Sequence, residues 1–188
     1  LTLLAELQRR YGMSYVFISH DLAVVRAMSH RVMVMKNGLI EQVGSPIEIY
    51  EKPANEFIAA FVGYVNFMEG RIELIDPATS NTVVSTPYGK FDIALEQEDI
   101  RTGDDVLMVI RPESVTLSID CQQGGKNVLC GTLQTYMYAG SLAKCTVMIG
   151  DKKMIIDQYN PRDAQRFKHA EKVEVEIPRS VHLLKKKR

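Results

Sequence analysis

The chain has 188 residues, of which 46% are hydrophobic and 24% charged, a composition typical of a globular protein with one medium-sized domain or two small ones. Basic and acidic residues number 23 each, so no net charge favours nucleic acid or an acidic surface as a partner. No apolar run approaches the ~20 residues that a membrane-spanning helix needs, and the first residues lack the features of a signal peptide. We therefore expect a soluble chain without direct membrane insertion, truncated or processed because it starts at Leu1 rather than at Met.

The first third of the chain alternates helical and strand-like patterns. Apolar residues at helical spacing predict a helix from Leu1 to Tyr11, and Gly12 stands where a helix ends. The continuous apolar run Tyr15–Ser19 has the length and character of a strand that is buried on both faces. Asp21–His30 is helical in pattern again. This order of elements predicts an α/β architecture.

A hairpin and two short helices are predicted next. The apolar segments Val32–Met35 and Leu39–Val43 flank an Asn-Gly turn, which tolerates the left-handed backbone of a tight hairpin. Ser45-Pro46-Ile47-Glu48 has the residues of a capping box, with proline at the first helical position. A further helix is predicted for Asn55–Val62.

From about Val65 the pattern changes to short β-branched runs that are separated by turn residues. Many short strands at this spacing indicate an all-β barrel or sandwich. We place an α/β portion at residues 1–64 and an all-β domain at residues 65–188. The clearest strand candidates are Asn81–Thr86, Val106–Ile110, Val115–Ile119 and Cys145–Ile149.

The predicted strand Tyr15–Ser19 has few strands to pair with in this sequence. A sheet this small would leave apolar edges open. We expect the rest of the sheet to lie upstream of Leu1 or on another chain. Since exposed apolar surface tends to be covered, we also expect a chain that is not monomeric, with segments exchanged between copies as one way to cover the edge.

His20 directly follows the predicted strand and precedes a helix, the place where α/β proteins bind ligands. A neutral imidazole there can bind a phosphate oxygen or an attacking water, and a protonated one can offset developing negative charge. The alternative is that His20 caps the helix or fills a gap in the core. Ser19-His20-Asp21 alone favours this alternative, because catalytic triads are assembled in space rather than in sequence.

The order of motifs from Tyr11 to Gly63 resembles the C-terminal stretch of ABC-transporter ATPases. It runs through an apolar strand, Ser-His-Asp, a helix, a second strand, an Asn-Gly turn, a capped helix and Phe-x-Gly. In this family the strand-end histidine is the switch, or H-loop, residue. The resemblance implies that His20 contacts the γ-phosphate of ATP and helps to position the attacking water, which suits phosphoryl transfer.

Three short motifs of the second half resemble the TOBE domain, a paired OB-like β-barrel that is appended to importer ATPases. The resemblance makes Arg111, Glu113, Gly140 and Ser141 candidates for an interface or a regulatory site, and an ion-paired turn is the alternative for the first two. The first motif is more similar to polyamine, ferric-iron and phosphonate importers than to sugar importers. The motifs are Asn66-Phe67-Met68-Glu69-Gly70, Ile110-Arg111-Pro112-Glu113 and Tyr138-Ala139-Gly140-Ser141.

The motifs with which this family grips nucleotide are missing from the sequence. There is no G-x-x-x-x-G-K-[ST] phosphate loop, no Leu-Ser-Gly-Gly-Gln signature and no Asp-Glu pair for magnesium. Gly124-Gly125-Lys126 is predicted to be a hairpin turn between β-strands. ATP and Mg are implied as cofactors of the full-length protein, whereas we expect neither cofactor in this chain and no ATP hydrolysis by it alone.

The cysteine and histidine patterns predict no metal site. Cys121, Cys130 and Cys145 are an odd, irregularly spaced set, which predicts free thiols in a reducing cytosol. The other histidines stand apart from any cluster with metal-ligand spacing: His30, His169 and His182.

Three classes of function remain. The first is the ATP-binding, energy-coupling subunit of an importer, with membrane permease subunits as partners, a homodimer through the ATPase and TOBE domains, and a peripheral place on the cytoplasmic face of the membrane. The second is a regulatory β-barrel that binds a small ligand or a protein. Nucleic-acid binding ranks last, because the net charge is zero, aromatic residues make up 7% and tryptophan is absent.

Overall fold

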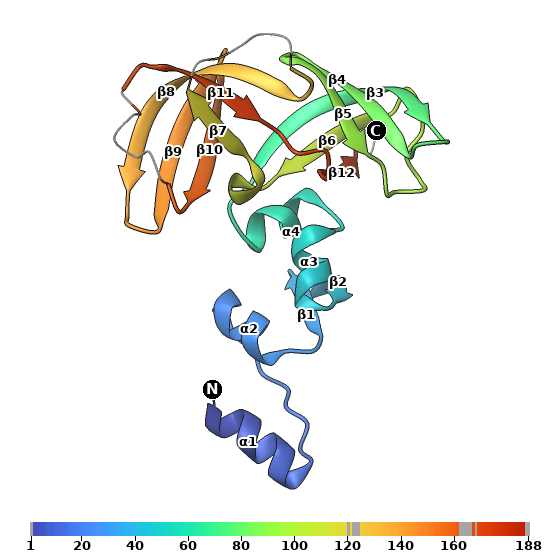
Figure 1. The fold of residues 1–188 in the computed structure, drawn as a ribbon. Helices are drawn as coiled ribbons and strands as arrows, with labels where there is room; N and C mark the ends of the chain where they lie inside the picture. Colours follow the sequence, from blue (N-terminus) through green and yellow to red (C-terminus); the bar gives the residue numbers. More distant parts are fainter. Residues whose placement is uncertain (1, 120, 122–124, 162–166, 168, 187–188) are drawn as a thin grey trace. The chain divides into compact units, whose positions relative to one another are not determined.

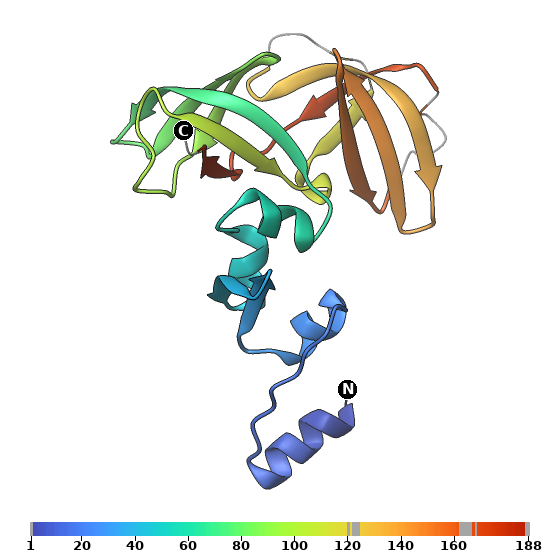
Figure 2. The same cartoon turned by 180° about the vertical axis from the view of Figure 1, so that it is seen from behind.

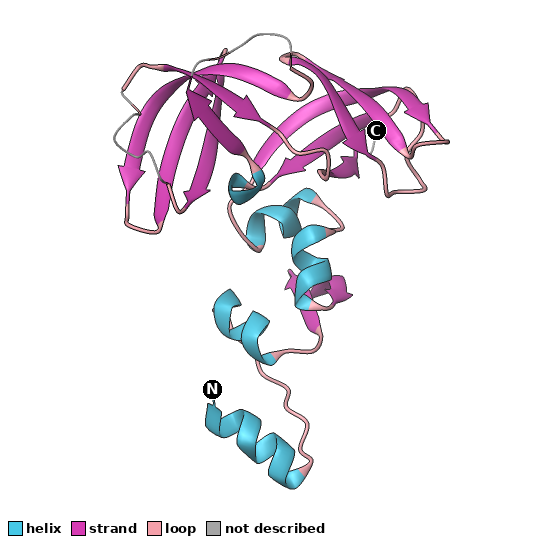
Figure 3. Ribbon diagram, viewed as in Figure 1, coloured by secondary structure: helices cyan, strands magenta, loops and turns pink. Residues whose placement is uncertain are grey.

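The computed structural model describes residues 2–119, 121, 125–161, 167 and 169–186 and divides the chain into two compact units, Leu1–Gly63 and Tyr64–Arg188 (Figure 1). In the described residues, α-helices belong to the first unit, and the second unit is built almost wholly from strands (Figure 3). Each unit has its own hydrophobic core and is described separately.

The helices and the hairpin of the first unit lie where the sequence predicts them. Gly12 follows the first helix with a φ of +62°, the left-handed geometry that commonly ends a helix. Asn37 and Gly38 turn the hairpin with φ values of 51° and 80°, as the Asn-Gly pair predicts. The elements are α1 (Thr2–Tyr11), α2 (Leu22–Met28), β1 (Val32–Lys36), β2 (Leu39–Gly44), α3 (Pro46–Glu51) and α4 (Glu56–Phe61).

Side-chain caps fix the starts of α3 and α4. Ser45 Oγ accepts a hydrogen bond from Glu48 N at 3.2 Å, and Glu48 Oε2 accepts one from Ser45 N at 2.7 Å, which completes the predicted capping box. The backbone N–H of Ser45, and then its hydroxyl, hold the pKa of Glu48 below its ordinary value. Asn55 Oδ1 caps α4 by accepting from Ile58 N at 3.0 Å.

The strand predicted for Tyr15–Ser19 is wrong: residues 13–19 have no regular secondary structure. Val16 is 98% exposed and Ile18 102%. A strand that is buried on both faces needs neighbours for its backbone hydrogen bonds. In the described part of the first unit β1 and β2 are the only strands, and they pair with each other. The described part of the first unit thus consists of helices and one β-hairpin instead of the expected α/β sheet.

The second unit is all β, as predicted, and consists of two five-stranded antiparallel sheets. The β3 sheet has the order β12-β6-β3-β4-β5, and the β8 sheet has the order β10-β9-β8-β11-β7. Asn81–Thr86 has the same bounds in the prediction and in the structure. The strands are β3 (Asn66–Asp76), β4 (Asn81–Thr86), β5 (Gly89–Ala94), β6 (Asp105–Ile110), β7 (Thr116–Ile119), β8 (Val128–Tyr138), β9 (Leu142–Ile149), β10 (Lys152–Tyr159), β11 (Lys172–Glu176) and β12 (His182–Lys185).

The two sheets repeat one plan. Their central strands, β3 and β8, are each 11 residues long, and each forms a bulged hairpin with the strand that follows. Gly70 and Gly131 occupy matching positions in these strands. A Cβ atom on Gly70 would lie 2.5 Å from Val84 Cγ1, and one on Gly131 would lie 3.0 Å from the carbonyl oxygen of Met148. The close approach of the next strand therefore excludes a side chain at both positions.

The chain crosses between the sheets twice (Figure 2). β6 belongs to the β3 sheet, and after the 3-10 turn η1 (Pro112–Ser114) the next strand, β7, pairs with β11 in the β8 sheet. β11 belongs to the β8 sheet, and the strand after it, β12, pairs with β6 in the β3 sheet. Each sheet is thus completed by a strand that enters from the other.

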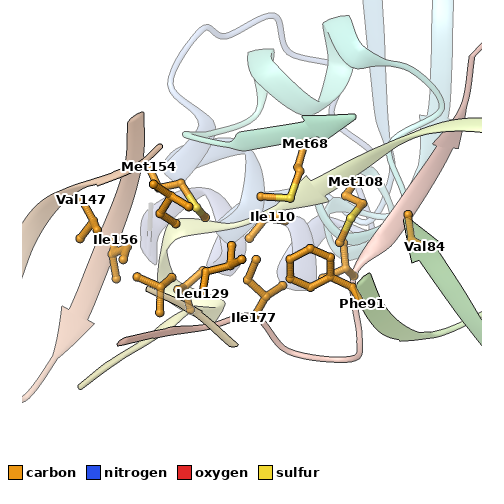
Figure 4. Close-up of a cluster of buried hydrophobic side chains, with 14 of the residues drawn as sticks. Met68, Val84, Phe91, Met108, Ile110, Leu129, Val147, Met154, Ile156 and Ile177 are labelled. Carbon is orange, nitrogen blue, oxygen red and sulfur yellow. The ribbon is translucent and has the colours of Figure 1, made fainter. Parts of the chain in front are cut away.

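One hydrophobic core runs through both sheets. Phe91 and Met108 come from the β3 sheet and Ile156 from the β8 sheet, and all three are buried. Figure 4 shows Ile110 and Ile177 between these two groups. Ile110 ends β6 and Ile177 follows β11, so the two crossing points meet in the core. Burial of this core is the main favourable contribution to folding of the unit.

Two buried asparagines join each sheet to the edge strand of the other. Asn66, at the start of β3, donates from Nδ2 to Ile155 O in β10 at 2.7 Å and accepts from Ile155 N at 2.8 Å. Asn127, directly before β8, donates from Nδ2 to Asp92 O in β5 at 2.8 Å and accepts from Asp92 N at 2.6 Å. We call these contacts the Asn66 clamp and the Asn127 clamp.

The chemistry of asparagine suits an open sheet edge. β5 and β10 end their sheets, and an edge strand has backbone N–H and C=O groups that no neighbouring strand satisfies. The amide of asparagine carries one acceptor and donors, so it satisfies both groups of one backbone residue. Asn66 is 6% exposed and Asn127 5%, which leaves water little access to these hydrogen bonds.

Removal of either clamp should destabilise the second unit. Asn66→Ala leaves a backbone N–H and C=O unsatisfied, and Asn127→Gly does the same while tolerating the φ of 59° at that position. We expect each variant to lower the free energy of unfolding by about 1–3 kcal/mol in urea titrations. Asn160→Gly is the matched control, since Asn160 also has positive φ (47°) but is exposed. An equal loss in the control would contradict the assignment.

Candidate functional site

His20 lies in the segment between α1 and α2, with its side chain exposed. The next residue, Asp21, is the N-cap of α2: its Oδ1 accepts from Ala23 N at 2.9 Å and from Val24 N at 3.2 Å. Asp21 rather than His20 thus caps α2, and His20 makes no core contact among the residues that the structure describes. The imidazole faces solvent directly before a helix of seven residues.

Arg111 ties the end of β6 to the start of the second unit. The residue is 8% exposed, and its Nη1 donates to the carbonyl oxygen of Tyr64 at 3.3 Å. Its own carbonyl accepts from Ser114 N at 3.1 Å and from Ser114 Oγ at 2.8 Å, which closes the turn η1. Glu113 lies in that turn and is exposed. The buried guanidinium thus contributes to the structure at the point where the chain leaves β6.

Gly140 and Ser141 form the exposed tip of the β8–β9 hairpin. Gly140 has a φ of +78°, and Ala139 N donates to Leu142 O at 2.7 Å across the turn. Ser141 O accepts from Asn160 N at 2.8 Å, which joins the hairpin tip to the end of β10. The positive φ is the physical reason for glycine in this motif.

Tyr64 and Lys144 contact each other beside Arg111, and sequence reasoning missed both. Lys144 Nζ lies 5.1 Å from the centre of the Tyr64 ring, a cation–π contact. The same ammonium lies 3.9 Å from Asp157 Oδ2, whose side chain is 14% exposed. Arg111, directly after β6, and Lys144, in β9, therefore both contact Tyr64. Nothing in the local sequence of Tyr64 indicates this, because its partners come from distant strands.

The clamps were also missed as candidate residues, although the sequence carried a signal. Asn66 precedes Gly70 by four residues, and Asn127 precedes Gly131 by the same interval. Both pairs start the long central strand of their sheet. The repeated Asn-x-x-x-Gly spacing could have identified the two sheets as copies of one plan.

The prediction of three free thiols is wrong, because a disulfide joins Cys121 and Cys130, with 5.7 Å between their Cα atoms. The fold brings the two residues into the range of Cα separation that a disulfide needs, which their spacing in sequence does not reveal. Cys145 is free and buried. Burial, and then the nearby carboxylate of Asp157, raise the pKa of the Cys145 thiol to about 11.

The described residues contain no group of three or more His, Cys, Asp or Glu side chains that could hold a metal ion. His169 Nδ1 lies 2.6 Å from Gln134 O, and His182 Nδ1 lies 2.7 Å from Gln97 Nε2. Lys126, from the Gly-Gly-Lys motif, bonds Asp92 Oδ2 at 2.8 Å, whereas Gly124 lies outside the described residues. None of the helices in the described part is both long and apolar enough to cross a membrane.

Comparison with known protein families assigns the second unit. Residues 108–184, from β6 to β12, match the sequence model of the TOBE domain. The chain contains a TOBE domain. The match spans strands of both sheets and both crossings and includes the disulfide, Asn127 and Ile155, whereas Asn66 and Asp92 precede it.

Curated relatives extend the similarity to both units. The spermidine/putrescine import ATP-binding protein PotA of Thermobifida fusca is 32% identical over 166 residues, which cover 87% of this chain and 42% of that protein. The protein of the same name from Nitratidesulfovibrio vulgaris is 34% identical over 164 residues, which cover 80% of this chain and 41% of that protein. The chain is thus similar to the TOBE-containing, C-terminal region of ABC-importer ATP-binding proteins, and it spans less than half of their length.

A solved structure shares the fold of the second unit. The cytoplasmic molybdate-binding protein ModG, with molybdate bound, superposes with a TM-score of 0.54 and 17% identity, covering 63% of this chain and 94% of that one. At this identity the likeness establishes a common fold of the TOBE domain and no common ligand.

The burial of Arg111 predicts a structural role that the exposed hairpin tip does not share. Arg111→Met should lower the free energy of unfolding of the TOBE domain by about 1–3 kcal/mol, because the hydrogen bond from the charged guanidinium to the carbonyl of Tyr64 is lost. Ser141→Ala removes an exposed hydroxyl and should change it by less than about 0.5 kcal/mol. Chemical denaturation of both variants measures this, and equal stability of Arg111→Met and the unsubstituted chain would contradict the assignment.

Proposed function

We propose that this chain is part of the ATP-binding subunit of an ABC importer for polyamines. One observation carries the proposal: similarity to spermidine/putrescine import ATP-binding proteins covers up to 87% of the chain in the relatives described above. The second unit alone is too short to account for this coverage, so the match includes part of the first unit. The TOBE domain fits the same assignment.

The first unit is proposed to be the C-terminal portion of the ATPase domain. Its apolar segment Tyr15–Ser19, which has no regular secondary structure here, would then be covered by the rest of that domain. The exposure of Val16 and Ile18 supports this, since apolar side chains of this size are usually covered in a finished protein. Ferric-iron and phosphonate import remain less favoured, because the relatives described above are named for spermidine and putrescine.

His20 is the residue proposed to act on nucleotide. In the complete ATPase it would contact the γ-phosphate of ATP and help to position the attacking water, and its exposed place before the capped helix α2 leaves the imidazole accessible for this. The phosphate loop and the magnesium carboxylates are not among these 188 residues. The chain by itself should therefore bind neither ATP nor Mg and should not hydrolyse ATP.

The proposed partners follow from the same assignment. An importer ATP-binding subunit works on membrane permease subunits at the cytoplasmic face, and we propose that two copies assemble through their ATPase and TOBE domains. The exposed apolar segment of the first unit is the surface that such assembly, or the rest of the ATPase domain, would cover.

A substitution of His20 tests the proposed role. In the protein extended to the length of its relatives, His20→Ala should lower the ATPase rate roughly 100-fold or more, the size expected when one transition-state contact is lost. His30→Ala is the matched control, since His30 is also exposed in the first unit, and its rate should stay unchanged. ATPase activity that survives His20→Ala, or His20-dependent turnover by the 188-residue chain alone, would contradict the proposal.

The substrate is tested separately in the assembled transporter. Reconstituted with its permease subunits and solute receptor, the transporter should show ATPase stimulation and uptake with spermidine. The same preparation should respond to neither ferric iron nor a phosphonate. Stimulation by either of these compounds and not by spermidine would refute polyamine import while leaving the role of His20 intact.

A further inference from the structure

The disulfide Cys121–Cys130 spans a strand that lies between its two ends. Cys130 belongs to β8, and Cys121 follows β7 by two residues. In the β8 sheet β7 and β8 are not neighbours, because β11 pairs with both of them. The disulfide therefore connects, across β11, two parts of the sheet that share no backbone ladder.

The same disulfide encloses the residues of the Asn127 clamp. Between the two cysteines in sequence lie Lys126 and Asn127, which bind Asp92 in the other sheet through an ion pair at 2.8 Å and the two amide hydrogen bonds. The carbonyl of Asn127 also accepts from Ile177 N at 2.9 Å, at the crossing from β11 to β12. Three contacts to Asp92 in the other sheet, and one to the crossing after β11, thus depend on Lys126 and Asn127, which lie between the two cysteines in sequence.

We propose that Cys121 and Cys130 form a reversible thiol–disulfide site whose oxidation state sets how firmly the Asn127 clamp holds β5. Oxidation removes two protons and two electrons from the pair of thiols and forms the S–S bond. The oxidant is a small disulfide such as oxidised glutathione, whose own S–S bond breaks to release two thiols. Reduction by dithiol exchange reverses the step.

Among the three cysteines, only this pair is accessible to a small disulfide, and only one of the two clamps lies beside it. Cys121 and Cys130 are half-buried, so a small disulfide reaches them, whereas Cys145 is 1% exposed. The Asn66 clamp makes the matching contact in the other sheet, and the sequence has no further cysteine with which to staple it. One of two equivalent clamps is thus under redox control, and the other is an internal reference.

Whether the Cys121–Cys130 pair is oxidised depends on the redox conditions of the compartment. Intracellular disulfides of mesophilic proteins are usually transient or redox-sensing rather than permanent structural bonds. With the cytoplasmic location of the proposed function, the pair is reduced under ordinary conditions and oxidised under disulfide stress. The expected resting state thus rests on the proposed function, whereas the thiol chemistry does not depend on ATP or transport and is tested separately.

A thiol count establishes the bond. The intact chain is incubated with oxidised glutathione or with dithiothreitol, unfolded in guanidinium and alkylated, and the product is weighed by mass spectrometry. We expect one alkylated cysteine after oxidation and three after reduction. The oxidised chain should yield one disulfide-linked peptide that contains Cys121 and Cys130. Three alkylated cysteines, or glutathione adducts without this linkage, after oxidation would overturn the proposal.

Amide hydrogen exchange tests the effect on the clamp. On reduction the amides of Asp92 and Ile177, whose acceptors belong to Asn127, should exchange faster, on the order of tenfold. The amide of Ile155, held by the Asn66 clamp, should keep its rate. Cys121→Ser and Cys130→Ser should show the fast rates in either buffer, and Cys145→Ser should respond as the unsubstituted chain does. Equal rates for Asp92 in both redox states, or an equal change at Ile155, would refute the coupling.

Discussion

The free edges of β5 and β10 impose the constraint on which the second unit depends. Each edge strand has a residue, Asp92 or Ile155, whose backbone N–H and C=O bond to no strand of its own sheet, and such groups are costly to leave unsatisfied away from water. Asn127 and Asn66 supply the missing donor and acceptor from the opposite sheet. Because the two contacts are reciprocal, neither sheet is finished until the other is in place.

The two points at which the chain crosses between the sheets also join the sheets to each other. β7 and β12 each complete the sheet into which they cross, and Ile110 and Ile177 fill the core at the two crossing points. A chain connected in this way should fold and unfold the two sheets together. The buried guanidinium of Arg111 holds the start of the second unit through its hydrogen bond to the carbonyl of Tyr64.

The sequence predicted correctly those features that depend on interactions between residues close together in the chain. The capping box of Ser45, the turn at Asn37-Gly38 and the bounds of β4 all follow from interactions among near neighbours in sequence. The strand at Tyr15–Ser19 failed because strand formation depends on partners, which the described part of the chain lacks. The clamps join residues 89 and 35 positions apart, so the repeated Asn-x-x-x-Gly spacing marks the two asparagines but not their partners. The disulfide depends on the order β7-β11-β8, which the spacing of the cysteines does not reveal. For His20, sequence located the residue, and the structure added that Asp21 rather than His20 caps α2; its role in ATP hydrolysis stays a prediction.

The claim that the clamps unite the two sheets is tested most directly by native-state hydrogen exchange across increasing urea. Core amides of β4 and of β9, in the two sheets, should converge on one opening free energy that equals the global free energy of unfolding of the domain. The amides of Asp92 and Ile155 should join the same unfolding unit. Exchange of one sheet at low urea while the other stays protected would show that the sheets open separately, and it would contradict the claim that the clamps make the second unit one cooperative body.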